Sequence, residues 1–442
     1  MPARARDDRG QAVVLLALAL SGLLGAAGLA VDAGLLYVER RHEQVAADAA
    51  AFAAATALTV NWDKGNRESI ARAAALDYAA SNGYEDGTTT TVSVNIPPES
   101  GPRAGDDDYV EVIVVRDMPT AFVRILGPGF ATRRVQARAV GGITGPGKPY
   151  ALIALSRTAS PAVLFDGDKV KVDSKDAGIM VNSSAAVALE VIGRADIKTV
   201  KSTEGGVDVV GDVSIDSKAK IDGVVVGAPF VNDPLAYLEP PDGAGLPSFS
   251  AVNVTTGTTT LTPGIYPSIS VSGNGHIKLE AGTYIIKGGG ITISDHGKID
   301  DEDAGVLLYN ACSAWPAEGG ICGALTMTGH AHLDLKRKDS GDGMGVSYWQ
   351  PCENTQTISI NGEDEVDEDE KAHIHTRGAV YAPCAGLDVA GDAKLHLHDD
   401  NDVDQAGMVV VDTISLSDKA DVKIKWKDAE ASAFIRIPSL VE

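Results

Sequence analysis

VSGNGHIK at residues 271–278, MTGHAHLD at 327–334 and VAGDAKLH at 389–396 are copies of one eight-residue block. In all copies the first and seventh positions are apolar, the third is Gly or Asp, and the sixth and eighth are polar. The fifth is Ala, Gly or, once, Val. A block that recurs in this way indicates one structural unit used repeatedly. The seven copies start at Val191, Val209, Val271, Ile293, Met327, Val389 and Leu416.

The block has a direct physical interpretation. Its Gly or Asp turns the chain, and because strand side chains alternate between two faces, positions five and seven are buried while six and eight are exposed. Starts 18 or 22 residues apart fit one turn of a β-solenoid, and starts 27 or 34 apart fit a turn with an insertion. An antiparallel sandwich would also alternate, but it has no reason to repeat Gly, Asp and Ala at fixed offsets. The sequence therefore predicts a right-handed parallel β-helix over residues 150–442.

The N-terminal region contains a long apolar run, AVVLLALALSGLLGAAGLAV, at residues 12–31. Twenty residues of helix are about 30 Å long, enough to cross a bilayer. A cleaved secretory peptide has a shorter apolar centre and a small-residue cut site, so we expect a retained single-pass transmembrane helix; removal or burial of the segment is the alternative. Arg4, Arg6 and Arg9 precede the run. They predict that residues 1–11 are cytoplasmic and that the C-terminal bulk is extracellular or on the cell surface.

The pattern of residues 32–145 predicts a small α+β domain. The helical pattern continues past residue 31 through an alanine-rich stretch, with no break before Asn61. A second helix is expected from an N-cap at Asn66 to Asn82. The remaining expected elements are strands near Thr90–Ile96 and Tyr109–Val115, a short helix after Pro119 and a strand near Arg134–Val140.

The net charge of −23, from 38 Lys and Arg against 61 Asp and Glu, disfavours nucleic acid as a partner. We also expect that no Lys/Arg-rich stripe interrupts this acidic surface. No GxSxG, HExxH or P-loop motif occurs, so we expect no enzyme, no catalytic residue and no cofactor-binding residue. The enzyme alternative is a β-helix polysaccharide lyase or hydrolase at the cell surface. Asp334, with Lys336 and Arg337 nearby, would supply the acidic and basic side chains that such an enzyme needs.

Four cysteines lie far downstream of the apolar run, on the side predicted to be oxidising. An even number in that compartment fits disulfide bonds, and the spacing lacks the CxxC pattern of zinc sites. Four cysteines allow three pairings. Among these we expect Cys312 with Cys322 across a short loop, and Cys352 with Cys384.

Acidic clusters are the better candidates for a metal ligand. DDED at 300–303, EDEVDEDE at 363–370 and DDNDVD at 399–404 each lie beside a block or in an insertion. Calcium binds six to eight oxygen ligands, and crowded carboxylates repel one another without a cation. The candidate calcium ligands are Asp300, Asp301, Asp303, Asp400, Asp402 and Asp404. The alternative is that these runs are solvated and only increase solubility.

Three His-x-His pairs also place two imidazoles on one face of a strand: His330 with His332, His373 with His375, and His396 with His398. Stacked rungs could gather such pairs around zinc or copper. However, His332 and His396 occupy block positions that hold Lys or Asp in other copies. We therefore expect exposed polar side chains rather than a metal site.

The segment at residues 9–55 resembles the N-terminal segment of TadE/TadG-like proteins of the Tad (Flp) pilus system. The resemblance lies in a basic-Gly start, a membrane helix, Asp32 and Gly34 at its outer end, and the alanines at 46–51. Later stretches such as LTPGIYPSISVSGNGHIK also resemble the Gly-rich extracellular region attached to such anchors. Leu15 stands where prepilin-type precursors carry Glu, so the resemblance does not extend to the cleavage motif after Gly10.

This resemblance implies that the α+β domain at residues 32–145 is pilin-like. It also implies a membrane-anchored extracellular component of pilus assembly or surface adhesion, with a structural role. It implies that the partners are the membrane and other pilus or surface subunits, reached through the N-terminal helix. The non-enzymatic alternative is a self-assembling filament or surface-layer subunit, which would form homo-oligomers.

Overall fold

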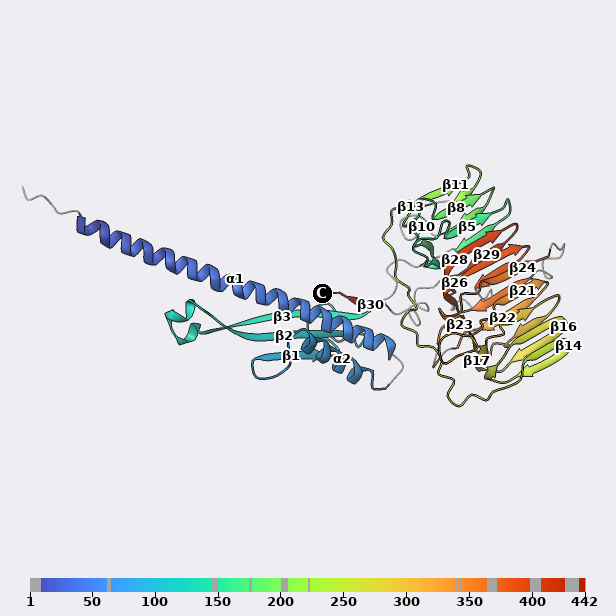
Figure 1. Cartoon of the computed structure of the whole chain (residues 1–442), viewed down its shortest axis with the longest axis horizontal. Helices are drawn as coiled ribbons and strands as arrows, with labels where there is room; N and C mark the ends of the chain where they lie inside the picture. The colour runs from blue at the N-terminus through green and yellow to red at the C-terminus, as the bar shows by residue number, and fades with distance from the viewer. Residues whose placement is uncertain are drawn as a thin grey trace, which may run out of the picture. The chain divides into compact units, whose positions relative to one another are not determined.

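The chain forms two units in this computed structural model (Figure 1). Unit 1 contains Met1–Thr144 and Ile437–Glu442, and unit 2 contains Gly145–Arg436. The residues that the structure describes are 9–61, 65–144, 150–174, 177–199, 206–221, 223–338, 340–341, 343–363, 372–397, 407–425 and 437–441.

Two helices of unit 1 match the sequence prediction. Helix α1, Arg9–Val60, runs for 52 residues without a break, and α2 covers Arg67–Ser81. Alanine faces bring both helices close to the sheet of this unit, because small side chains permit close approach. The Asn66 side chain makes no capping hydrogen bond; instead its backbone carbonyl accepts N–H groups from Ser69 and Ile70. The fully buried alanines are Ala46, Ala47, Ala50, Ala51, Ala54, Ala55, Ala71, Ala75 and Ala79.

Unit 1 also contains a four-stranded antiparallel sheet in the order β1-β2-β3-β30. Two short 3-10 helices, η1 at Val123–Leu126 and η2 at Pro128–Phe130, lie between β2 and β3. Buried Val92, Val94, Val112 and Val114 join the helix alanines in one core. The strands are β1 Thr90–Asn95, β2 Tyr109–Pro119, β3 Thr132–Thr144 and β30 Ile437–Leu440.

The β-helix does not extend to residue 442 as expected, because strand β30 belongs to unit 1. The sequence assigned the whole region after residue 150 to the β-helix, but Ile437–Leu440 pairs with β3, and Ile437 lies opposite Thr144. The β-helix is therefore an insertion between two neighbouring strands of unit 1. A four-residue strand that contains Pro438 carries too little periodicity to be recognised without its partner.

Unit 2 is a parallel β coil, as predicted. All pairings between its named strands are parallel and join one rung to the next. The strands are β4 Tyr150–Ala154, β5 Val163–Asp166, β6 Lys171–Ser174, β7 Gly178–Val181, β8 Leu189–Ile192, β9 Asp196–Lys198, β10 Val207–Val209, β11 Val213–Ile215, β12 Lys220–Ile221, β13 Val224–Val226, β14 Val252–Leu261, β15 Gly264–Tyr266, β16 Ile269–Leu279, β17 Gly282–Lys287, β18 Ile291–Ile293, β19 Lys298–Asp300, β20 Val306–Ala311, β21 Leu325–Gly329, β22 His332–Lys336, β23 Val346–Trp349, β24 Ile358–Gly362, β25 His373–Arg377, β26 Ala379–Gly391, β27 Lys394–Leu397, β28 Met408–Ser417 and β29 Asp421–Ile424.

The rungs do not stack in sequence order. The first rung, β4 to β6, pairs with the last one, β28 and β29. The chain therefore enters the coil in its middle and builds one end through β13. It then crosses through residues 227–251 to the other end and returns rung by rung. In Figure 1 the red C-terminal rungs lie between the green and yellow ones.

The seventh block position forms a buried interior column, as the alternation predicted. Its members are aligned in register from rung to rung. One predicted copy is out of register. Ile215 is the seventh residue of the copy at Val209, but it pairs with Val191, the first residue of the preceding copy. The residue that pairs with Ile197, the seventh position of that copy, is Ile221. That unit therefore starts at Ile215. The column contains Ile277, Ile299, Leu333, Ile374, Leu395, Val422, Val172 and Ile197, none more than 4% exposed.

Candidate functional site

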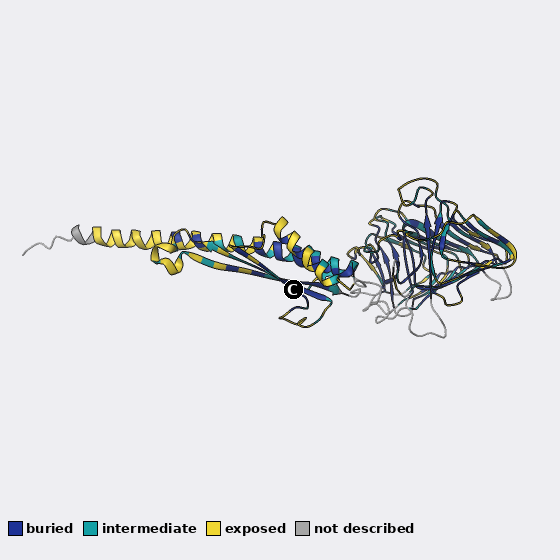
Figure 2. Ribbon diagram, turned by 90° about the horizontal axis from the view of Figure 1, so that it is seen from below, coloured by how far each residue is buried: buried dark blue, intermediate teal, exposed yellow. Residues whose placement is uncertain are grey.

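Residues 13–27 of α1 are all exposed, and apart from Ser21 they are apolar or glycine; Figure 2 shows this part of the helix in yellow. Leu16 and Leu23 are both 69% exposed, and only 6% of the most apolar 18-residue window is buried. This is the one helix, within the part of the chain that the structure describes, that is long and apolar enough to cross a membrane. Such a surface requires a lipid or protein environment that covers it.

Asp32, the first residue after the apolar run, fastens a loop to the helix. Its side chain is buried, and its carboxylate accepts the backbone N–H groups of Ala121 at 2.7 Å, Phe122 at 2.9 Å and Val123 at 2.6 Å. The first N–H groups of a helix have no partner within it, and the residue before η1 provides no side-chain cap. Asp32 therefore caps η1 from 89 to 91 positions away in the sequence.

Gly28 lies one helical turn before Asp32 on the same face. A Cβ atom added at Gly28 would be 2.9 Å from Cβ of Phe122, too close for ordinary packing. By contrast, a Cβ at Gly22 or Gly25 would meet nothing within 4 Å. Gly28 and Asp32 together fix the β2–β3 loop against the last turn of the apolar run.

A second candidate site is a charged groove on unit 2. The sixth block position forms a column across five adjacent rungs: Lys394, Asp421, Lys171, Asp196 and Lys220. These residues line a groove of about 750 Å³ together with Asp168, Lys169, Val170, Arg194, Lys218, Asp392, Lys419 and Lys423.

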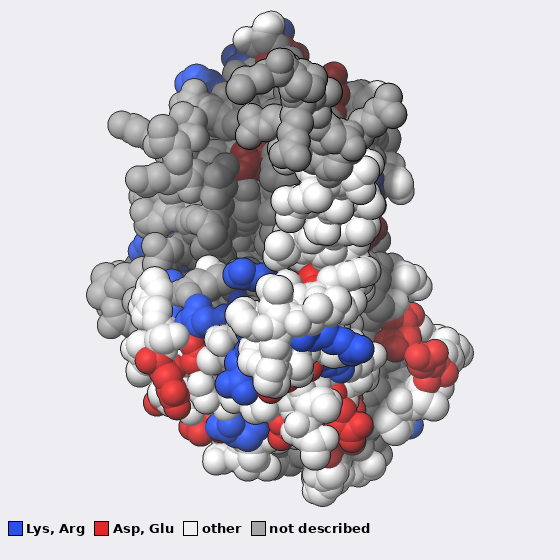
Figure 3. Space-filling model, turned by 90° about the vertical axis from the view of Figure 1, so that its left-hand side faces the viewer, with Lys and Arg blue, Asp and Glu red and all other residues white. Residues whose placement is uncertain are grey.

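Eight Lys and Arg side chains and four Asp side chains line this groove, although the whole chain carries a net charge of −23. The prediction that no Lys/Arg-rich stripe interrupts the acidic surface is therefore wrong. These residues are spread over 256 positions and meet only because the rungs stack. An alignment of the blocks would have brought Arg194, Asp196, Asp392, Lys394, Lys419 and Asp421 together at the fourth and sixth positions, but not Lys171 and Lys220, which lie outside the seven copies. Figure 3 shows one face of the molecule, on which basic and acidic side chains are interspersed.

The predicted calcium ligands in DDED have partners within the protein. Asp300 contacts His276 Nε2 at 2.6 Å and Lys298 Nζ at 2.8 Å. Asp301 accepts the N–H groups of Gly305 and Lys336, and Asp303 pairs with Arg377. In the described ranges no three His, Cys, Asp or Glu residues form a group that could hold a metal. Asp400, Asp402 and Asp404 lie outside those ranges, so calcium binding there stays a prediction.

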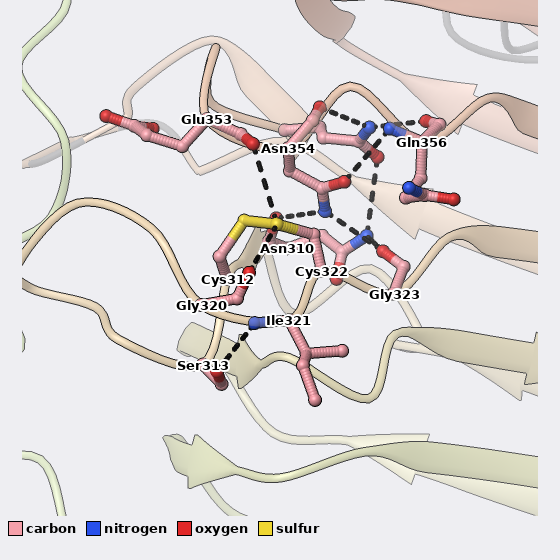
Figure 4. The surroundings of a disulfide bond; sticks show 11 residues. Asn310, Cys312, Ser313, Gly320, Ile321, Cys322, Gly323, Glu353, Asn354 and Gln356 are labelled. Carbon is pink, nitrogen blue, oxygen red and sulfur yellow. Dashed lines mark hydrogen bonds between the residues drawn. A yellow bond between two sulfur atoms is a disulfide. The ribbon is translucent and has the colours of Figure 1, made fainter.

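Both expected disulfide bonds are present, Cys312–Cys322 and Cys352–Cys384. Figure 4 shows the first bond beside a buried polar network that the sequence did not indicate. The Asn354 side chain donates to the carbonyls of Asn310 and Gly323, and the Asn310 side chain donates to Gly323 and to the Tyr348 hydroxyl. This network joins the loop of the first bond to the loop that carries Cys352.

The histidines are more buried than expected. His330 and His396 are each 8% exposed, and His332, His373 and His375 are partly buried; His398 lies outside the described residues. The prediction of exposed side chains is wrong because imidazole rings on adjacent rungs cover one another. The centroids of His373 and His396 are 4.7 Å apart. Burial, with repulsion from neighbouring cations, lowers the pKa of His373 to about 3.

Asp334, the residue of the enzyme alternative, lies within an ion-pair cluster. Its Oδ1 atom contacts His375 Nδ1 at 3.1 Å and an Arg377 nitrogen at 3.4 Å. Burial alone would raise the pKa of this carboxyl, but the hydrogen bond and charge of His375 outweigh burial and lower the pKa. A carboxylate held ionised in this way is unsuited to act as a general acid.

Comparison with known families identifies the N-terminal segment. Residues 10–57 match the family Tad, described as "Putative Flp pilus-assembly TadE/G-like". The helix α1 carries a TadE/G-like domain. The resemblance noted at residues 9–55 is thereby confirmed, and together with the apolar helix it indicates a membrane-anchored, pilus-related protein. The TadE/G-like match includes Gly28 and Asp32, but the β-helix lies outside it. Searches of curated proteins and of solved structures gave no match.

Proposed function

We propose that the protein is an extracellular structural component of a Tad (Flp) type pilus system that acts in pilus assembly or surface adhesion. The observation that carries this proposal is the continuity of α1. One helix leads from an apolar run of bilayer length into a face buried in the core of unit 1. The N-terminus would lie in the cytoplasm, because Arg4, Arg6 and Arg9 precede the run. The two disulfide bonds fit an oxidising location for unit 2.

Cysteine labelling in whole cells tests this orientation. Ala3→Cys reports on the N-terminus, and Ala73→Cys reports on an exposed position of α2. A membrane-impermeant maleimide should label Ala73→Cys in intact cells and Ala3→Cys only after the membrane is permeabilised. Labelling of Ala3→Cys alone in intact cells would reverse the proposed orientation. Recovery of both variants in the soluble fraction would refute membrane anchoring.

The groove on unit 2 supports adhesion to an acidic polysaccharide. Neighbouring rungs are about 4.8 Å apart, so Lys394, Lys171 and Lys220, on every second rung, are spaced by about 10 Å. The intervening rungs carry Asp421 and Asp196 in the same column. This alternation fits a polymer with widely spaced acidic groups. A nucleic-acid strand has a phosphate about every 3.4 Å and would place negative charge against both aspartates.

Charge reversal tests this contact. The double variant Lys171→Glu with Lys220→Glu should lose binding to an acidic polysaccharide such as alginate by tenfold or more, and the binding of the unaltered chain should weaken with added salt. Lys287→Glu on β17, outside the groove, is the matched control and should bind normally. Equal binding by all three proteins would refute the role of the groove while leaving membrane anchoring untouched.

We propose a structural rather than an enzymatic role, and the two alternatives have direct tests. Release of reducing sugars from a polysaccharide panel, abolished by Asp334→Ala, would establish the lyase or hydrolase alternative. Ordered fibres or sheets formed by the purified chain alone in electron micrographs would favour the filament or surface-layer subunit. Other pilus subunits are the proposed partners of the exposed part of α1.

A further inference from the structure

The β2–β3 loop of unit 1 exposes a cluster of large apolar side chains. Ile125 is 80% exposed, Leu126 70%, Phe122 48% and Phe130 40%. The loop is held in one place by the Asp32 carboxylate and by the close approach of Phe122 to Gly28. A fixed apolar cluster of this size is unusual on a water-exposed surface and indicates an interaction site.

The attachment points place this loop at the edge of the membrane. Gly28 lies within the apolar run, and Asp32 directly follows its last residue, Val31. Gly28 is three residues from Val31, which is about 4.5 Å along a helix. Any bilayer that embeds residues 12–31 therefore reaches the level at which the loop contacts α1. Because the loop is attached to the membrane helix of its own chain, it meets lipid without a partner protein.

The charge of the loop fits a lipid surface. Between Met118 and Arg133 there is no Asp or Glu, whereas Arg124 and Arg133 are present; the next residue, Arg134, is paired with Asp117. The Arg133 guanidinium lies 4.9 Å from the centre of the Phe130 ring. Aromatic rings beside cationic side chains are typical of the interfacial region, where the ring contacts acyl chains and the cation contacts phosphate.

We propose that the β2–β3 loop inserts Ile125 and Leu126 into the leaflet that faces unit 1, with Arg124 and Arg133 at the level of the lipid phosphates. The loop is then a second membrane contact besides α1, and it restricts the tilt and rotation of unit 1 at the membrane surface. This proposal rests on the proposed function only in requiring that residues 12–31 span a bilayer.

Fluorescence quenching in nanodiscs tests the proposal with the full-length chain at one copy per disc. An environment-sensitive fluorophore is attached at Ile125→Cys, at Leu20→Cys within the apolar run, or at Ala73→Cys on α2. Lipids with a quencher near the headgroup should quench the probe at residue 125 at least twofold. The probe at residue 73 should not be quenched, and deeper quenchers should reach residue 20.

The possible outcomes distinguish failure of the loop insertion from failure of the membrane anchor. Quenching at residue 20 without quenching at residue 125 would overturn the loop insertion and leave the membrane anchor intact. No quenching at either position would overturn the anchor itself. A probe at residue 125 that is shielded from water but not quenched by lipid would indicate that a protein surface covers the loop, which also overturns the proposal.

Discussion

Glu111, on strand β2, should make the stability of unit 1 depend on pH in the acidic range. Its side chain is 1% exposed, and its carboxylate accepts hydrogen bonds from Ser100 Oγ at 2.6 Å, Asn95 Nδ2 at 2.8 Å and Arg138 Nε at 2.6 Å. Burial alone would raise the pKa of this carboxyl. The hydrogen bonds outweigh burial and lower the pKa to about 2 from an ordinary value of 4.5.

The direction of the effect follows from the two pKa values. The folded state binds the proton less tightly than the unfolded state, so the ionised carboxylate stabilises folding above pH 4.5. This contribution decreases as the pH falls from 4.5 and is lost below 2. The difference between the folded and unfolded pKa values corresponds to up to about 3 kcal/mol. Glu111→Gln removes the charge and leaves Arg138 without its anionic partner, so it should cost a similar amount at neutral pH.

Pulse hydrogen exchange measures this effect in unit 1 separately from unit 2. The full-length protein in detergent is equilibrated in urea at pH 7 or pH 2.5, briefly labelled at one fixed pH, and analysed through peptides from β1 and β2. Unaltered protein and Glu111→Gln should differ by about 3 kcal/mol at pH 7 and by much less at pH 2.5. Glu85→Gln, an exposed control in the same unit, should match the unaltered protein. An equal difference at both pH values would refute the electrostatic explanation.

Three further predictions concern single features. Burial, with repulsion from a nearby glutamate, raises the pKa of Glu43 to about 7, so Glu43→Gln should stabilise unit 1 at pH 8 but not at pH 4; equal effects at both values would contradict this. Asp32→Ala should increase hydrogen exchange at residues 121–123 at least tenfold, because their N–H groups lose their acceptor; unchanged exchange would refute the capping role. Replacing Cys352 and Cys384 by Ser should lower the free energy of unfolding of unit 2 by about 4 kcal/mol in urea titrations, more than loss of the shorter-loop disulfide; a reversed order would contradict the loop-entropy argument.

Local patterns were sufficient to predict the elements and the interior of the coil. Alternation in each block identified the buried column, because strand side chains have a period of two wherever one face is covered. Helix α1 was predicted to its end, since nothing in the sequence interrupts it before Asn61. The copy predicted to start at Val209 is out of register, and the true unit starts at Ile215. The error arose because Val213 and Ile215 show the same alternation as the true unit.

Features that depend on distant residues were not predictable from the sequence. Asp32 was recognised only as part of a family pattern, and its hydrogen bonds to residues 121–123 required the loop to be in place. Similarly, Lys171 and Lys220 look like ordinary solvated positions of separate strands. Their arrangement in one groove depends on the rung order, and no local propensity determines whether the first rung stacks on the last.

The unusual rung order and the position of β30 have one structural consequence. Because β28 and β29 pair with β4, β5 and β6, the chain enters and leaves the coil at adjacent rungs in its middle. On the side of unit 1, the connections start at Thr144 and end at Ile437, which lie opposite each other in the β3–β30 pair. A load on the β-helix therefore reaches unit 1 through two chain segments that join paired strands, rather than through one linker. Under the structural role proposed above, a pulling force on unit 2 would be shared between these two connections.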